Sequence, residues 1–143
     1  MAVDIYPGYA RPKTALRVSL WTAQALLAIA FGLAGAMKLF TPMNALVDKL
    51  PWVMSVPTWL PRFIGAAELA GALGMILPSA TRIMPRLTVY AAAGLTTVML
   101  LAGMFHFSRG EFRALPVTLL LGSLAVFVGW GRGGPAPITP KAM

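Results

Sequence analysis

The chain has 143 residues, of which 58% are hydrophobic and only 11% are charged, and its mean hydropathy is +0.75. Soluble domains carry about 25% charged residues, so this composition excludes an ordinary soluble protein and indicates an integral membrane protein of one domain. The formal net charge of +8 comes from basic residues in short loops beside apolar blocks, which is typical of contact with anionic lipid headgroups and not of nucleic-acid binding.

The apolar residues form four blocks that are long enough to cross about 30 Å of hydrocarbon at about 1.5 Å per residue. We expect transmembrane helices at residues 15–40, 60–77, 87–107 and 115–130. Together they predict an all-α fold, an up-down four-helix transmembrane bundle over residues 15–130. The first block is too long for the apolar region of a cleaved signal peptide, so we expect it to be retained after an N-terminal segment of residues 1–14.

The predicted helices are separated by proline-rich connections. The longest one, residues 41–61, contains a short segment over residues 42–50 that we expect to form an interfacial helix capped by Thr41. Trp52 and Trp59 would then lie at the level of the lipid headgroups. Pro78 directly follows the second predicted span, and the Gly/Pro-rich residues 131–143 are expected to form a flexible tail.

The basic residues of the loops predict the orientation in the membrane. One side of the bundle would hold Arg11, Lys13, Arg17, Arg82, Arg86, Arg132 and Lys141, and the other Lys38, Lys49, Arg62, Arg109 and Arg113. Because Lys and Arg are more frequent in cytoplasmic loops, we expect both termini in the cytoplasm. The expected location of the protein is the inner membrane of a bacterium. The inner half would hold almost no ionisable residue beyond its boundary arginines.

Five polar residues, far apart in sequence, fall in the outer half of this topology. They are Lys38, Arg62, Glu68, His106 and Arg109. Glu68 lies six residues into the second span, which is about 9 Å deeper than Arg62. Lys38, Arg62 and Arg109 are close enough to helix ends to reach the headgroups, whereas Glu68 is too short and needs a partner. Lys38 or His106 from a neighbouring helix is the expected partner, because Arg62 lies on another side of the same helix.

This polar layer has two interpretations. Either it fixes the register of the helices, or it binds a ligand or transfers protons. If it binds a ligand, the predicted ligand-binding residues are the five named above. No metal site is expected, since one histidine and one membrane-embedded glutamate are too few ligands, and the absence of cysteine excludes thiolate-held clusters. Small residues at four-residue spacing predict close helix packing through Gly32, Ala36, Ala67, Gly71 and Gly74. Gln24, Thr96 and Thr97 are candidates for hydrogen bonds between helices.

Four stretches of the sequence resemble the DoxX-like family of small four-helix membrane proteins. They are GLAGAMKLF, RFIGAAELAGALGMILP, RIMPRLTVYAAAGLTTVMLLAGMFHFSRGE and LLLGSLAVFVGWGR. The most specific part is R-x2-G-x2-E-L-x-G-x2-G-x2-L-P, matched from Arg62 to Pro78, and the resemblance covers residues 18–132. Relatives with an assigned role are membrane subunits of oxidoreductase systems, one part of a thiosulfate:quinone oxidoreductase and another in a complex with superoxide dismutase and a sulfurtransferase. The family has no shared catalytic constellation, so the resemblance assigns no catalytic residue and leaves enzyme activity open.

The resemblance implies a small accessory subunit of a membrane redox assembly. A quinone or similar amphipathic molecule is the candidate cofactor, near Lys38, Glu68 and His106, because its headgroup needs a donor, an acceptor and an apolar channel for its tail. The expected partners are the lipid bilayer and other membrane subunits or further copies of the chain. Two alternatives stay open: a purely structural or assembly subunit, and a carrier of protons or small solutes that uses Glu68.

Overall fold

The computed structural model of the protein describes residues 13–142. Its elements in chain order are α1 (Thr14–Phe40), α2 (Met43–Lys49), η1 (Pro51–Ser55), α3 (Trp59–Thr81), α4 (Leu87–Ser108), η2 (Phe112–Ala114) and α5 (Leu115–Gly133). Within the described residues, four helices are long and apolar enough to cross a membrane, namely α1, α3, α4 and the segment from η2 through α5. The predicted all-α four-helix transmembrane fold is therefore confirmed.

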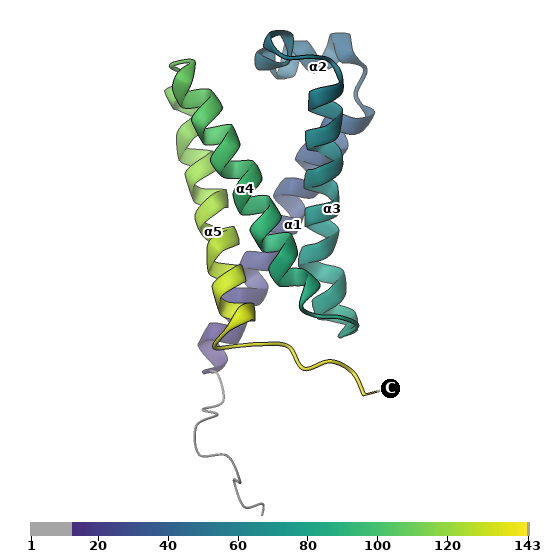
Figure 1. Cartoon of the computed structure of the whole chain (residues 1–143), viewed down its shortest axis with the longest axis vertical. Helices are drawn as coiled ribbons and strands as arrows, with labels where there is room; N and C mark the ends of the chain where they lie inside the picture. The colour runs from purple at the N-terminus through teal and green to yellow at the C-terminus, as the bar shows by residue number, and fades with distance from the viewer. Residues whose placement is uncertain (1–12, 143) are drawn as a thin grey trace, which may run out of the picture.

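The four long helices form a ring in which each contacts its neighbours in chain order and α5 closes back on α1. The first residues of α1 and the last of α5 lie at one end of the bundle, here called the terminal end, and α2 and η1 lie at the other, the α2 end (Figure 1). Toward the α2 end, α4 and α5 lean away from α1 and α3. That the terminal end faces the cytoplasm stays a prediction, and Arg11 with nearly all of the predicted N-terminal segment lies outside the described residues.

The second predicted span ends too early at residue 77, because α3 continues through Pro78 to Thr81. Proline lacks the N–H that would bond to the Gly74 carbonyl and normally disturbs the turn before it. Inside a bundle, side chains of neighbouring helices replace such lost bonds. Gln24 of α1 donates its amide to the carbonyl of Met75, in the disturbed turn. Gln24 thus contacts the backbone of α3 one residue after the carbonyl that Pro78 leaves without its helical partner.

The closest approach of α1 to α3 occurs at Gly35 and Gly65. A Cβ atom placed on Gly35 would lie 2.7 Å from the Gly65 carbonyl oxygen and 2.8 Å from the Leu69 backbone nitrogen. Real Cβ atoms do not come this close to backbone atoms, so only glycine allows this crossing. Sequence spacing predicted close packing but missed Gly35.

The predicted packing residues contribute unequally. A Cβ atom added to Gly71 would lie 2.5 Å from Leu95 and one added to Gly74 would lie 2.7 Å from Ala91, both at the α3–α4 interface, whereas one added to Gly32 would meet Ala72 at an ordinary 3.8 Å. Ala36 and Ala67 are only half-buried. Beside these contacts lies a core of large apolar side chains from all four helices, of which the most buried are Leu27, Phe31, Met75, Leu95 and Val128.

The connection between α1 and α3 contains the predicted short helix, α2, but the helix begins at Met43 and not at residue 42. Pro42 is the N-cap residue of α2 and no side chain caps the helix, so the predicted hydroxyl cap from Thr41 is wrong. The carbonyl of Thr41 has another role, because it accepts a hydrogen bond from Arg62. The turn η1, which was not predicted, follows α2 and carries Trp52.

The segment after α5, predicted to be flexible, makes hydrogen bonds along the terminal end. Arg82 donates from Nε to the carbonyl of Thr139, and the Lys141 amide donates to the carbonyl of Arg82. Ala136 is buried, and its carbonyl accepts a bond from Arg132. These contacts connect the C-terminal segment to the α3–α4 turn and to the last turn of α5.

Candidate functional site

A buried ion pair joins α1 and α3 just beside their closest approach. Lys38 packs against Gly65 and Glu68 packs against Gly35, so the two glycines leave room for the two charged side chains. The Nζ atom of Lys38 lies 2.7 Å from Oε2 of Glu68. Lys38 is 8% exposed and Glu68 is 4% exposed. The predicted partnership of Glu68 with Lys38 is confirmed, but Lys38 does not extend to the membrane surface as expected.

Arg62 has a different set of partners. Its guanidinium donates to the backbone carbonyls of Lys38, Leu39 and Thr41, at the C-terminal end of α1. The last carbonyls of a helix have no partner within the helix, and together they carry a partial negative charge. Arg62 therefore caps the C-terminal end of α1 and binds the backbone at Lys38.

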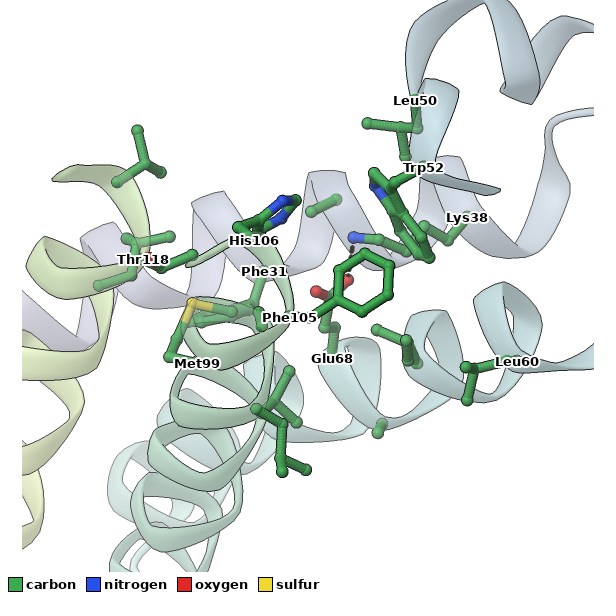
Figure 2. Close-up of a pocket in the computed structure, with 18 of the residues that line it drawn as sticks. Phe31, Lys38, Leu50, Trp52, Leu60, Glu68, Met99, Phe105, His106 and Thr118 are labelled. Carbon is green, nitrogen blue, oxygen red and sulfur yellow. Dashed lines mark hydrogen bonds and ion pairs between the residues drawn. The ribbon is translucent and has the colours of Figure 1, made fainter. Parts of the chain in front are cut away.

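The ion pair lines a cavity of about 470 Å³ between the four helices at the α2 end. Figure 2 shows the Lys38–Glu68 pair in the wall of this cavity, together with Trp52, Phe105 and His106. The rest of the wall is almost entirely apolar and includes Phe31, Leu60, Met99 and Leu121. Trp52 of η1 and Phe105 of α4 meet edge to face with ring centroids 6.0 Å apart. The connection between α1 and α3 thus contributes an aromatic wall to the cavity.

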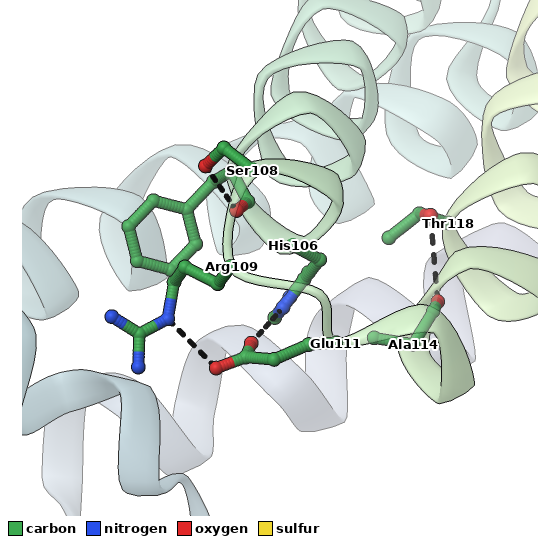
Figure 3. Close-up of polar contacts among 7 residues, drawn as sticks. His106, Ser108, Arg109, Glu111, Ala114 and Thr118 are labelled. Atoms are coloured by element: carbon green, nitrogen blue, oxygen red, sulfur yellow. Dashed lines mark hydrogen bonds and ion pairs between the residues drawn. The ribbon is translucent and has the colours of Figure 1, made fainter.

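The loop after α4 places Glu111 against His106. Gly110 has a φ of 70°, and the Gly110 and Glu111 amides donate to the carbonyls of Phe107 and His106. This is the Schellman pattern, in which a glycine ends the helix and the next residue folds back over the last turn. As a result, Oε2 of Glu111 lies 2.6 Å from Nδ1 of His106 (Figure 3).

Arg109 completes this loop cluster. Its Nε donates to Oε1 of Glu111 at 2.7 Å, and its guanidinium lies 5.3 Å from the centre of the Phe105 ring. Hydrogen bonds from Arg109 and His106 hold the pKa of the Glu111 carboxyl below its usual range. Glu111 is therefore ionised at neutral pH and binds two basic side chains at the membrane surface.

The structure brings three of the five predicted ligand-binding residues to one cavity: Lys38, Glu68 and His106. Arg62 and Arg109 do not line it. Trp52, Phe105 and Glu111 were missed as site residues. The sequence did contain a signal for Glu111: Gly110 follows the predicted third span, and a glycine just after a helix predicts that the next residue contacts the last helical turn. Trp52 had no such signal, because its place depends on how α2 and η1 fold over the bundle.

A second polar cluster was not foreseen. At the terminal end each long helix contributes one buried polar residue: Gln24, Ser79, Thr88 and Arg132. Arg132 donates from Nε to Oε1 of Gln24 at 2.7 Å, and its guanidinium lies 5.1 Å from the Trp21 ring centre. Gln24 also donates to Ser79, whose hydroxyl lies 2.8 Å from that of Thr88. Of these four residues only Arg132 is ionisable, and it is buried in the cluster instead of being exposed at the helix boundary as expected.

Among the three residues predicted to bond between helices, only Gln24 does so. The hydroxyls of Thr96 and Thr97 donate to the carbonyls of Ala92 and Ala93 in their own helix. A threonine on a helix readily finds the carbonyl one turn earlier, which explains why the prediction was wrong. Within residues 13–142, no group of three or more His, Cys, Asp or Glu side chains is arranged to hold a metal ion.

The family model described as the DoxX-like family matches residues 22–128, from the first third of α1 into the last part of α5. No curated protein and no solved structure matches the chain.

Proposed function

Because the chain belongs to the DoxX-like family, we propose that it is a small membrane subunit of a redox assembly and binds a quinone or a similar amphipathic molecule in the cavity at the α2 end. The observation that carries this proposal is the Lys38–Glu68 pair in the wall of an otherwise apolar cavity.

The wall of the cavity offers what such a ligand needs. A quinone headgroup carries oxygen atoms that accept hydrogen bonds, and its reduced form also donates them. Lys38 supplies a donor and Glu68 an acceptor at one place, with His106 in the same wall. The apolar side chains around them suit a ring and the start of an isoprenoid tail, as in ligand sites that are mostly apolar with a few convergent polar groups.

The cost of the ion pair also supports a role beyond packing. Two charges removed from water lose several kcal/mol each, and well-packed apolar residues of similar volume are often as stable or more stable. A pair that served only to fix the helix crossing would not need a cavity beside it. Here the pair is next to empty space large enough for a small ring, which favours a ligand.

Binding is tested by fluorescence in lipid nanodiscs, with decylubiquinone as the probe. A variant that keeps Trp52 as its only tryptophan places the reporter in the cavity wall, and a matched control keeps only Trp59, which is 63% exposed on the outside of α3. We expect saturable quenching of Trp52 and only unsaturable quenching of Trp59. Equal, unsaturable quenching of both reporters would contradict the proposal.

A second candidate function, a structural or assembly subunit, is favoured by a separate observation. An open apolar groove of about 620 Å³ runs between α4 and α5, with Gly103 and Gly122 in its wall. Small residues allow another membrane helix to approach closely. If the protein acts only in assembly, Gly103→Leu will abolish co-purification of large partner subunits from native membranes, and decylubiquinone will not bind. If it binds the quinone, the same substitution will leave Trp52 quenching unchanged.

A further inference from the structure

His106 lies between the cavity and the membrane surface. Its ring is part of the cavity wall, and its side chain is 16% exposed. Its Nδ1 atom contacts Glu111, a loop residue whose side chain is 34% exposed. His106 thus belongs to the cavity wall and contacts Glu111 in the α4–α5 loop, and Figure 3 shows this contact.

The contact with Glu111 determines what each ring nitrogen can do. Because the Glu111 carboxylate only accepts hydrogen bonds, the neutral imidazole donates to it from Nδ1–H. The Nε2 atom then carries a lone pair, and among the described residues it has no hydrogen-bond partner of its own. It is the ring nitrogen that remains free to accept a hydrogen bond.

The charges around the ring are suited to proton exchange. On its own helix and loop, His106 faces Glu111, which Arg109 also binds. Across the cavity, α1 and α3 contribute Lys38 and Glu68, which bind each other. Glu111 is thus the carboxylate that stabilises a protonated imidazole, while Lys38 and Glu68 largely compensate each other.

From this arrangement we infer that His106 exchanges protons between a hydroxyl-bearing headgroup in the cavity and the water at the α2 end, with Glu111 as its positioning residue and proton acceptor. The inference rests on the proposed binding function. In the outward direction the O–H bond of the headgroup breaks and a bond forms between that proton and Nε2. The Nδ1 proton then passes to Oε2 of Glu111 and from there to water, and no electron moves in this step. The same transfers in reverse return a proton to the headgroup.

His106 is the only histidine of the chain, so nitrogen NMR of the full-length protein with ¹⁵N-labelled imidazole gives one residue's signals without assignment. In nanodiscs near neutral pH, we expect a protonated Nδ1 and an unprotonated Nε2. Decylubiquinol, the reduced probe, should shift the Nε2 signal toward that of a protonated nitrogen. Glu111→Gln should give a mixture of both tautomers, and decylubiquinol binding should weaken in proportion to the fraction of rings that lose the Nε2 lone pair, about twofold for an equal mixture.

Asp48→Asn is the matched control, since Asp48 is an exposed acid on α2 and the substitution changes the net charge equally. It should leave tautomer and affinity unchanged. If decylubiquinol quenches Trp52 but leaves the Nε2 signal in place, His106 does not exchange protons with the ligand and the inference is overturned, while binding stands. An unprotonated Nδ1 in the wild-type protein without ligand also overturns it. If neither Trp52 nor Nε2 responds, the binding function itself has failed.

Discussion

Removing one charge of the Lys38–Glu68 pair should destabilise the bundle far more than removing both. At 2.7 Å the attraction between the two charges is about 6 kcal/mol for an effective dielectric constant of about 20. Desolvation of the two ions, several kcal/mol each, offsets most of that. Lys38→Met therefore leaves a 4% exposed carboxylate without its partner, at a cost of about 3–5 kcal/mol. Replacing both residues by Met should cost little or even stabilise the bundle.

The free energy of unfolding is measured in mild detergent for the wild type, Lys38→Met, Glu68→Met and the double variant. Methionine keeps an unbranched stem at either position, so the comparison changes charge more than volume. The reasoning requires a double variant at least as stable as either single variant. Single substitutions that each cost less than about 1 kcal/mol, the range of exposed surface pairs, would show that the pair is not buried as described.

Other substitutions test the neighbouring features. Gly35→Ala should cost about 1–3 kcal/mol by overpacking against the α3 backbone, whereas Gly94→Ala, which meets nothing within 4 Å, should be neutral or stabilising in the same unfolding assay; equal effects would contradict the helix crossing. Arg62→Met should cost about 1.5–3 kcal/mol through the lost bonds to the end of α1, and an unchanged unfolding free energy would contradict that role. The pKa of Glu111 in the folded protein lies below its ordinary value of 4.5. The ionised carboxylate therefore stabilises the fold fully above pH 4.5, and this stabilisation is lost as the pH falls through the lowered pKa. Glu111→Gln should remove this pH-dependent contribution to the unfolding free energy. Melting curves of wild type and variant should thus converge in acid, and a constant gap between them would refute this.

Much of the fold was predictable because the bilayer restricts what a chain can do. Long apolar blocks must form helices that satisfy their own backbone groups, and the four spans agree with the structure within a few residues at most ends. The exception is α3, which continues through Pro78 to Thr81, and where the Gln24 side chain of α1 bonds to its backbone. That contact depends on tertiary packing, which no local pattern contains.

The site was predictable only where a physical demand limited the choice of partners. A glutamate deep in a membrane needs a partner; the sequence left Lys38 or His106, and the structure shows that it is Lys38. Arg62 was predicted to bind a ligand, but its guanidinium donates to backbone carbonyls of α1. Which carbonyls it can reach depends on how the two helices cross. Arg132 was predicted to lie in a loop at the membrane boundary, where an arginine normally reaches water. In the structure it is buried, because it bonds to Gln24 and to the C-terminal segment.

The binding of a quinone headgroup beside Lys38 and Glu68 is tested most directly by photolabelling. The protein in nanodiscs is illuminated with an azido-substituted quinone, and the labelled residues are identified by mass spectrometry. We predict labels on η1 and the last turns of α4, above all at Trp52 and Phe105, that disappear in the Lys38→Met/Glu68→Met double variant. Labels confined to the outer, lipid-facing side chains, and unchanged in that variant, would contradict a binding site in the cavity.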